Sequence, residues 1–337
     1  MSDIVAKMSS SIFQALFLST LTLVSGCAAL AQSSSATLRS PNGQLAITFQ
    51  TVDKQTPSSS GQLTYAVQFQ GKPLVDRSAL SLDLQSQRPL GAAVRIVKAT
   101  PSSQDKTYRL VTGKASEVRD HYNALRIELE EPAGMGRQLV MEARAYDDAI
   151  AFRYVVPEQR ALRNFRLTQE HTEFRISKDA TTYALELPNF SSMYESEYVK
   201  LPITAFTNQG GVASNILIGC PLLMDIPGVA WMAITEANLR DYSSMYLVNP
   251  SHSWAGHWLE SRLAPQEENP ELAVTGALPH HSAWRVLLVG AEPGRLVESN
   301  VITSLNPPSE IKDTSWIHAG NTSWDWWSGS VGPDGKP

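Results

Sequence analysis

The sequence has very little cysteine, with only Cys27 and Cys220 among 337 residues. Cys27 falls within a segment that has the pattern of a cleavable leader, which would leave Cys220 without a partner in the mature chain. Disulfides are therefore not expected to hold this fold. Cys220 follows an apolar run, where a buried and unreactive thiol is the expected state.

An excess of basic charge is also missing. The chain carries 28 Lys and Arg against 33 Asp and Glu, for a formal net charge of −5. Nucleic-acid binding depends on clustered basic side chains that neutralise phosphates, and none is found here. The sequence also lacks a Gly-x-Ser-x-Gly elbow, a phosphate-binding loop and a dinucleotide fingerprint. These absences argue against nucleic acid as a partner and against the commonest hydrolase and nucleotide sites.

The one long apolar run lies near the N-terminus, where Lys7 precedes residues 12–24 and small residues follow. This is the pattern of a secretory signal, and the run is shorter than the ~20 apolar residues that a membrane span needs. Two exits compete. Cleavage before Cys27 would leave a lipidated membrane anchor, whereas cleavage after Ala31 would release an unanchored protein. We assign residues 1–31 as the signal peptide and expect membrane attachment only through Cys27.

Helical periodicity is nearly absent between residues 43 and 290, where apolar and polar residues alternate instead. Leu45, Ile47 and Phe49 show the pattern, which is typical of strands with one buried face. Residues 139–145 and 150–156 are expected to form a hairpin across the two aspartates at 147–148. So many strands without intervening helices predict an all-β fold, a large antiparallel β-sandwich.

A single short C-terminal helix is expected to begin near Pro293 and to end before the prolines at 307–308. Val297, Val301 and Leu305 would share one of its faces. After this helix the composition changes, because four of the eight tryptophans fall between residues 316 and 327. We therefore place one domain at residues 37–305 and a different segment at residues 306–337.

Four stretches together resemble glycoside hydrolase family 97. They are Tyr-Glu-Ser-Glu-Tyr at 194–198, Thr-Glu-Ala-Asn-Leu-Arg-Asp-Tyr at 235–242, Ala-Trp-Arg-Val at 283–286 and the tryptophan-rich residues 313–329. The resemblance covers about residues 37–329. It implies a galactose-mutarotase-like N-terminal supersandwich at 37–305, followed by a linker and the first strand of a (β/α)8 barrel. The rest of that barrel would be missing, so the chain is expected to be truncated. Residues 317–321 depart from the turn that is usual in the family.

The resemblance also implies a function. Family 97 enzymes are mostly periplasmic bacterial α-glucosidases and α-galactosidases acting on α-linked oligosaccharides, and their catalytic carboxylates lie on the barrel. We therefore assign no catalytic residue in this chain. The sandwich would pack on the barrel as its partner, and the chain alone would be inactive. A freestanding carbohydrate-binding or adhesion sandwich is the alternative, against which the tryptophan-rich strand at the C-terminal end argues.

The family binds a calcium ion near the substrate, and its sandwich contributes a glutamate to that site. Glu195 is the best positional match and Glu197 the second. Calcium takes about 6–8 oxygen ligands, so these carboxylates would not hold the ion tightly without the barrel. The competing interpretation is that both are solvated loop residues.

Trp324, Asp325 and Trp326 offer a substrate-binding platform, because indole faces cover the C–H faces of sugars while a carboxylate accepts hydroxyl hydrogen bonds. The alternative is that these tryptophans are core, filling a barrel floor or a domain seam. Glu236 and Asp241 are expected in a loop after a strand at residues 229–234, either on the face turned to the barrel or in a solvated turn.

Overall fold

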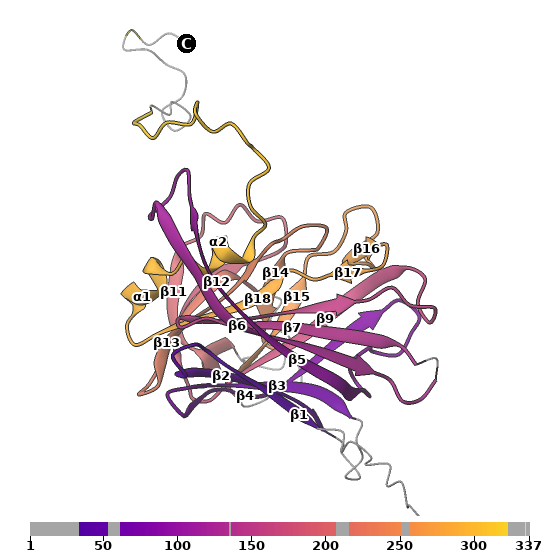
Figure 1. Cartoon of the computed structure of the whole chain (residues 1–337). Helices are drawn as coiled ribbons and strands as arrows, with labels where there is room; N and C mark the ends of the chain where they lie inside the picture. Colours follow the sequence, from indigo (N-terminus) through magenta and orange to yellow (C-terminus); the bar gives the residue numbers. More distant parts are fainter. Residues whose placement is uncertain are drawn as a thin grey trace, which may run out of the picture. The chain divides into compact units, whose positions relative to one another are not determined.

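The computed structural model describes residues 34–52, 61–134, 136–206, 216–250, 256–322 and 334. Within these residues, eighteen strands are linked by hydrogen bonds into a single sheet that folds over into two layers (Figure 1). All the strand pairs are antiparallel, as the sequence predicted, and the all-β sandwich is confirmed. Neither helix of the described part has the length and apolar character that a membrane crossing requires.

Two runs of neighbouring strands make up the layers. The first run, in pairing order, is β1 (Ser35–Arg39), β2 (Leu45–Val52), β3 (Gln62–Phe69), β4 (Lys72–Leu84), β9 (Phe165–Ile176), β15 (Trp258–Leu263) and β14 (Met245–Val248). The second run is β5 (Arg95–Arg109), β6 (Glu117–Glu130), β7 (Gln138–Ala145), β8 (Ala149–Val156), β18 (Trp284–Gly290) and β13 (Ala230–Ala237).

The two runs meet at β12 (Leu217–Ile226), which pairs with β13 through one half and with β14 through the other. Further out, β12 pairs with β10 (Thr181–Leu187), and β10 with β11 (Tyr198–Pro202). A 3-10 helix, η1 (Ile203–Phe206), follows β11. Short strands β16 (Val274–Gly276) and β17 (His280–His281) add to β9 and β8.

The main core lies between the two runs. Leu45, Ile47 and Phe49 on β2 are fully buried, so the alternation read from the sequence points inward. The ring of Phe152 on β8 lies 6.1 Å from that of Phe49 and 4.8 Å from that of Tyr65 on β3. These aromatic contacts connect the facing sides of the two runs. The expected hairpin is also confirmed, since β7 and β8 pair around residues 146–148.

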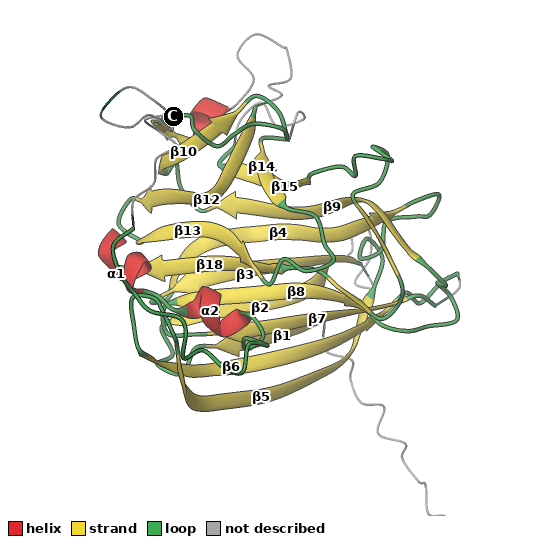
Figure 2. Cartoon of the chain, turned by 90° about the horizontal axis from the view of Figure 1, so that it is seen from above, coloured by secondary structure: helices red, strands yellow, loops and turns green. Residues whose placement is uncertain are grey.

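Strand β18 is buried on both faces, because a second apolar cluster covers its outer side. Leu287 and Val289 face the main core, whereas Trp284, Val286 and Leu288 belong to the second cluster. Two short helices close that cluster, α1 (Pro293–Glu298) and α2 (Val301–Leu305), which lie beside β13 and β18 (Figure 2).

The expectation of a single helix with Val297 on its buried face was wrong. The helical segment breaks at Ser299, whose backbone leaves the helical region (φ −59°, ψ 134°), and a second helix begins at Val301. Leu296, Val301 and Leu305 are buried, whereas the side chain of Val297 is 73% exposed. A periodicity counted across the break therefore assigns the wrong residue to the apolar face. The end at Leu305, before the two prolines, is as predicted.

A buried ion pair crosses from one run to the other. The Arg285 guanidinium on β18 donates two parallel hydrogen bonds, each 2.7 Å, to the two carboxylate oxygens of Glu170 on β9. Both side chains are 0% exposed. The two-point geometry is the strongest that an arginine and a carboxylate can make, and the desolvation cost of each charge makes either one expensive without the other.

A second charged contact ties three strands of the first run together on its outer side. Nε2 of His171 on β9 lies 3.0 Å from Oδ2 of Asp83 on β4, and Nδ1 contacts the carboxylate of Glu260 on β15. The hydrogen bond to Glu260 is the main reason that the pKa of His171 rises to about 9. The imidazole is therefore charged at neutral pH and attracted to a carboxylate on either side.

We expect Arg285→Met to lower the free energy of unfolding by about 3–5 kcal/mol, because it leaves Glu170 buried without a counter-charge. Urea titration of the purified chain measures this. As the control, Arg109→Ala removes a pair with Glu117 whose side chains are 84% and 55% exposed, and should cost less than about 1 kcal/mol. Equal losses in the two variants would contradict the bridging role of Arg285.

The His171 contact should make stability depend on pH. The folded pKa of about 9 lies above the unfolded value of about 6.5, so the stabilisation is full below pH ~6.5 and disappears as pH rises through about 9. Urea titrations at pH 6 and pH 9.5 should show a larger loss in the wild type than in His171→Gln. The same loss in both proteins would show that His171 is not the titrating group.

Candidate functional site

The residues singled out from the sequence occupy different surroundings. Glu195 and Glu197 are exposed and lie in the loop between β10 and β11. In the described part of the chain, no three His, Cys, Asp or Glu side chains are grouped so that they could hold a metal ion. Trp324, Asp325 and Trp326 lie outside the described residues, as does Cys27.

The structure brings together segments that are far apart in the sequence. Glu236 on β13 is the strand neighbour of Arg285 on β18, and its Oε2 accepts a hydrogen bond of 2.7 Å from Nη1. The Tyr242 hydroxyl, from the loop after β13, donates to Oε2 of Glu170 at 2.8 Å. The residue groups 235–242 and 283–286 thus form one buried cluster with Glu170.

Glu170 is completely satisfied. Its Oε1 accepts from Nε of Arg285 and from the Thr172 hydroxyl at 2.7 Å, and its Oε2 accepts from Nη2 of Arg285 and from Tyr242. The Tyr154 hydroxyl lies 2.8 Å from that of Thr172 and extends the network to β8. A carboxylate offers about four acceptor positions, so none of them is left for a substrate.

Glu236 differs from Glu170 in its electrostatics. Burial would raise the pKa of Glu170, but the charge and hydrogen bonds of Arg285 outweigh this and hold its pKa below the ordinary value. Burial raises the pKa of Glu236, and Arg285 offsets the rise only in part. One guanidinium therefore faces two carboxylates, of which Glu236 is the more readily protonated.

The placement of Glu236 corrects the sequence prediction, which put it in a loop. Strand β13 continues to Ala237, so Glu236 lies within the strand and its side chain is only 14% exposed. The backbone N–H of Met245 also donates to it, at 3.2 Å. Asp241 does lie in the loop and is exposed, which is the solvated-turn alternative.

Backbone strain is concentrated around this cluster. Among the described residues, five that are not glycine have positive φ, and three of them flank the cluster: Asn238 and Asp241, each at 54°, and Tyr194 at 59°. Asn238 also buries its Oδ1 without a hydrogen bond among those residues. Left-handed conformations of non-glycine residues cost about 1–3 kcal/mol and gather at functional sites.

Tyr194, in the motif at residues 194–198, lies at the same corner of the sandwich as the cluster around Arg285. Its ring lies 6.1 Å from that of Tyr246 on β14, and the charge of Glu236 acts on its hydroxyl. The ring passes so close to Gly219 on β12 that a Cβ there would lie 3.2 Å from Cε1 of Tyr194. The loop that carries Glu195 is therefore seated on β12 and β14.

Cys220, next to this contact, has no disulfide partner among the described residues. Burial raises the pKa of its thiol to about 12, so it remains protonated at neutral pH. Cys220 is half-buried rather than fully buried, and its lack of reactivity stays a prediction that the raised pKa supports.

Only weak signals for the cluster are present in the sequence. Glu170 and Thr172 occupy inward positions in the alternation of β9, between apolar residues such as Leu167 and Phe174. Arg285 interrupts an otherwise apolar strand. A charge at an inward strand position predicts a buried partner, but it does not identify that partner when the partner lies more than a hundred residues away.

Comparisons with known proteins agree with these motifs. Residues 38–308 match the family described as Glycosyl-hydrolase 97 N-terminal. A retaining alpha-galactosidase of Bacteroides thetaiotaomicron is 26% identical over 87% of this chain and 44% of its own length. A probable retaining alpha-galactosidase of Streptomyces bingchenggensis is 25% identical over 84% of this chain and 40% of its own. The chain thus spans less than half the length of these relatives.

Solved structures show the same fold. A glycoside hydrolase family 97 enzyme in complex with acarbose, from a Pseudoalteromonas species, superimposes with a TM-score of 0.72 at 26% identity. The match covers 84% of this chain and 39% of that one. A beta-arabinopyranosidase matches with a TM-score of 0.63 at 22% identity, which shows the fold alone. With four fifths of its residues inside the family match, this chain belongs to the glycosyl-hydrolase 97 N-terminal family.

Proposed function

We propose that this chain is the sandwich half of an α-glucosidase or α-galactosidase, which supports a catalytic barrel and completes its sugar and calcium sites. The observation that carries the proposal is the convergence of residues 194–198, 235–242 and 283–286 at one corner. Curated relatives with the name alpha-galactosidase and a structural relative bound to panose support α-linked oligosaccharides as substrates.

The corner has the features of a docking face rather than of a complete catalytic site. Its two buried carboxylates both bind Arg285, so they do not form the opposed pair that glycoside hydrolysis requires. Large apolar side chains at this corner are exposed, with Met193 at 83%, Tyr198 at 58% and Leu239 at 43%. Exposed apolar side chains of this size favour contact with another protein surface.

The segment that follows the sandwich passes the same corner. Glu310 lies 3.8 Å from the Arg240 guanidinium in the loop after β13. A barrel that continues from this segment would begin close to the exposed loops. We propose that Trp324, Asp325 and Trp326 belong to that barrel side of the substrate site.

Glu195 and Glu197 suit a shared calcium site. Both are exposed on a loop that Tyr194 fixes to the sheet, and carboxylate oxygens are the ligands that calcium prefers. Two carboxylates supply at most four of the ~6–8 oxygens, so the barrel has to provide the others. Glu195 would be the main ligand and Glu197 the second.

Residues 1–31 fit an export function for the whole protein. We propose that they direct secretion to the periplasm, with Cys27 as the lipidation site if the signal is cleaved before that residue. The segment lies outside the described residues. Mass spectrometry of the mature N-terminus would distinguish cleavage before Cys27 from cleavage after Ala31.

The purified chain should bind a calcium analogue weakly through Glu195. Terbium replaces calcium, and nearby tyrosines such as Tyr194 and Tyr198 would sensitise its luminescence. We expect Glu195→Gln to reduce this emission strongly and Glu197→Gln to reduce it less. Glu268→Gln, at another exposed loop carboxylate, is the control and should leave emission unchanged. Undiminished emission from Glu195→Gln would exclude it as a ligand.

The chain alone should not cleave aryl α-glucosides or aryl α-galactosides, because the opposed carboxylates would come from the barrel. The assay needs a parallel purification from cells that carry the empty vector. Turnover above that background by the purified chain would refute the proposal that the barrel supplies the catalytic carboxylates.

A further inference from the structure

The buried cluster around Arg285 holds more negative charge than positive charge. Glu170 and Glu236 both bind its guanidinium, and in the described part of the chain neither acid has an ion pair with another cation. One positive and two negative charges give the cluster a net charge of −1 when both acids are ionised. The other titratable groups that face these acids are the Cys220 thiol and the hydroxyls of Tyr154, Tyr194 and Tyr242. Burial raises the pKa of each of the four, so all of them are uncharged at neutral pH.

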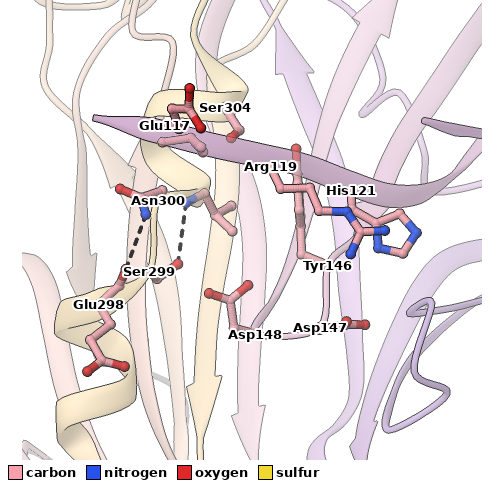
Figure 3. A pocket seen from close by; sticks show the side chains of 12 residues that line it. Glu117, Arg119, His121, Tyr146, Asp147, Asp148, Glu298, Ser299, Asn300 and Ser304 are labelled. Atoms are coloured by element: carbon pink, nitrogen blue, oxygen red, sulfur yellow. Dashed lines mark hydrogen bonds between the residues drawn. The ribbon is translucent and has the colours of Figure 1, made fainter. Parts of the chain in front are cut away.

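A second polar region, the pocket between β6, the β7–β8 turn and the helices α1 and α2, has a different balance (Figure 3). Of the charged residues that line it, Arg119 donates two hydrogen bonds of 2.7 Å to Asp105, and Glu298 lies 3.0 Å from Arg295. Each of these guanidiniums is paired with one acid, whereas Arg285 is paired with two.

The uncompensated charge falls on Glu236 rather than on Glu170. Glu170 receives two hydrogen bonds from Arg285, whereas Glu236 receives one. Glu236 also accepts from the backbone N–H of Met245, which lies 3.2 Å from each of its two oxygens. Burial raises the pKa of Glu236 despite the opposing charge of Arg285. Glu236 is therefore the first acid of the cluster to take up a proton as the pH falls.

Glu236 joins the two ends of the loop at residues 238–244. It lies at the end of β13, just before the loop begins, and its bond to Met245 reaches the residue at which β14 starts. Between these ends, the Tyr242 hydroxyl fixes the loop to Glu170. The closed loop thus depends on contacts with both acids of the cluster.

The backbone of the loop opposes this closed arrangement. Asn238 and Asp241 each have a φ of 54°, and the buried Oδ1 of Asn238 has no hydrogen bond among the described residues. Residues other than glycine adopt this conformation at a cost in free energy. The strain reduces the stability of the closed loop, and an ionised Glu236 without a full counter-charge reduces it further.

Burial sets the direction of the pH effect. In the closed loop the side chain of Glu236 is only 14% exposed, and its pKa is raised by that burial. Opening the loop admits water to the carboxylate, which brings its pKa back toward the ordinary value. The state in which a group has the higher pKa gains stability as the pH falls, so protonation of Glu236 favours the closed loop.

We propose that Glu236 is a proton-operated latch for the loop at residues 238–244: uptake of one proton neutralises the cluster and closes the loop, and loss of that proton loosens it. Glu236 is in this sense a positioning residue for Leu239 and Arg240, which the loop exposes at the corner. That this also regulates docking of a barrel rests on the function proposed above, whereas the coupling between proton and loop does not.

His280 is a second titratable group beside the loop. Its ring lies 6.1 Å from that of Tyr242 and is stacked 4.4 Å from that of Phe165. Burial lowers its pKa, although the backbone and the charge of Asp241 act in the opposite direction. His280 is therefore uncharged at neutral pH, and any effect of its protonation would persist in a variant that lacks the Glu236 carboxylate.

Hydrogen–deuterium exchange of the purified chain between pH 7.5 and pH 4.5 tests the latch, with each measured rate divided by the intrinsic rate at that pH. We expect the protection of the loop amides to rise about fivefold or more toward the acid end, with an upper limit of about tenfold per pH unit for one proton. Amides of β2 in the main core serve as the internal reference for global stability.

Glu236→Gln replaces the carboxylate with a neutral group of the same shape. We expect its loop at pH 7.5 to be as protected as the wild-type loop at pH 4.5, with no further change on acidification. A residue that only anchors the loop would give the opposite result, because loss of charge-assisted hydrogen bonds lowers protection.

The matched control is Glu142→Gln, because Glu142 is one acid between two guanidiniums, those of Arg126 and Arg153. Burial alone would raise the pKa of Glu142, but these arginines hold it below the ordinary value. This variant should keep the wild-type pH profile of the loop. The latch is overturned if the wild-type profile is flat, which is decisive even if Glu236→Gln fails to fold. It is also overturned if the Glu236→Gln loop is less protected than the wild type, or if that loop keeps the pH dependence and so assigns it to His280.

Discussion

Two charges buried at the centre of the sandwich constrain much of the fold. Arg285 and Glu170 are both fully buried, and they come from strands in opposite layers. Neither is tolerable in an apolar interior without the other, so the two layers have one relative position in which both are neutralised. The side chains that complete the hydrogen bonds of Glu170 then fix β9 against the loop after β13.

This constraint extends to the surface because Arg285 has a second acid to satisfy. Glu236 accepts a third hydrogen bond from Arg285 and lies near the edge of the cluster, where it also accepts from the backbone N–H of Met245. The strained residues Asn238 and Asp241 lie in the loop that returns the chain from Glu236 to Tyr242. A rigid charged base thus holds a strained loop in place, which is the arrangement expected when a loop has to present a fixed surface.

Tyr146 illustrates the opposite situation, a polar group that the fold leaves unsatisfied. The second apolar cluster buries its ring beneath the helices, yet its hydroxyl finds no partner of normal geometry among the described residues. Arg285 and Glu170 at the centre of the sandwich are fully paired, whereas Arg144 acts on this buried hydroxyl without a hydrogen bond of normal geometry.

The sequence by itself determined the fold class, because the alternation of Leu45, Ile47 and Phe49 and of many similar strands depends only on local geometry. It also determined the family, through motifs whose residues are adjacent in the chain. It missed Glu170, misplaced Glu236 and gave Val297 the wrong face, since each depends on contacts that local periodicity does not encode. Only the tertiary structure decided that Arg285 meets both acids. A buried charge selects its partner by distance in space, and 115 residues separate Arg285 from Glu170 along the chain.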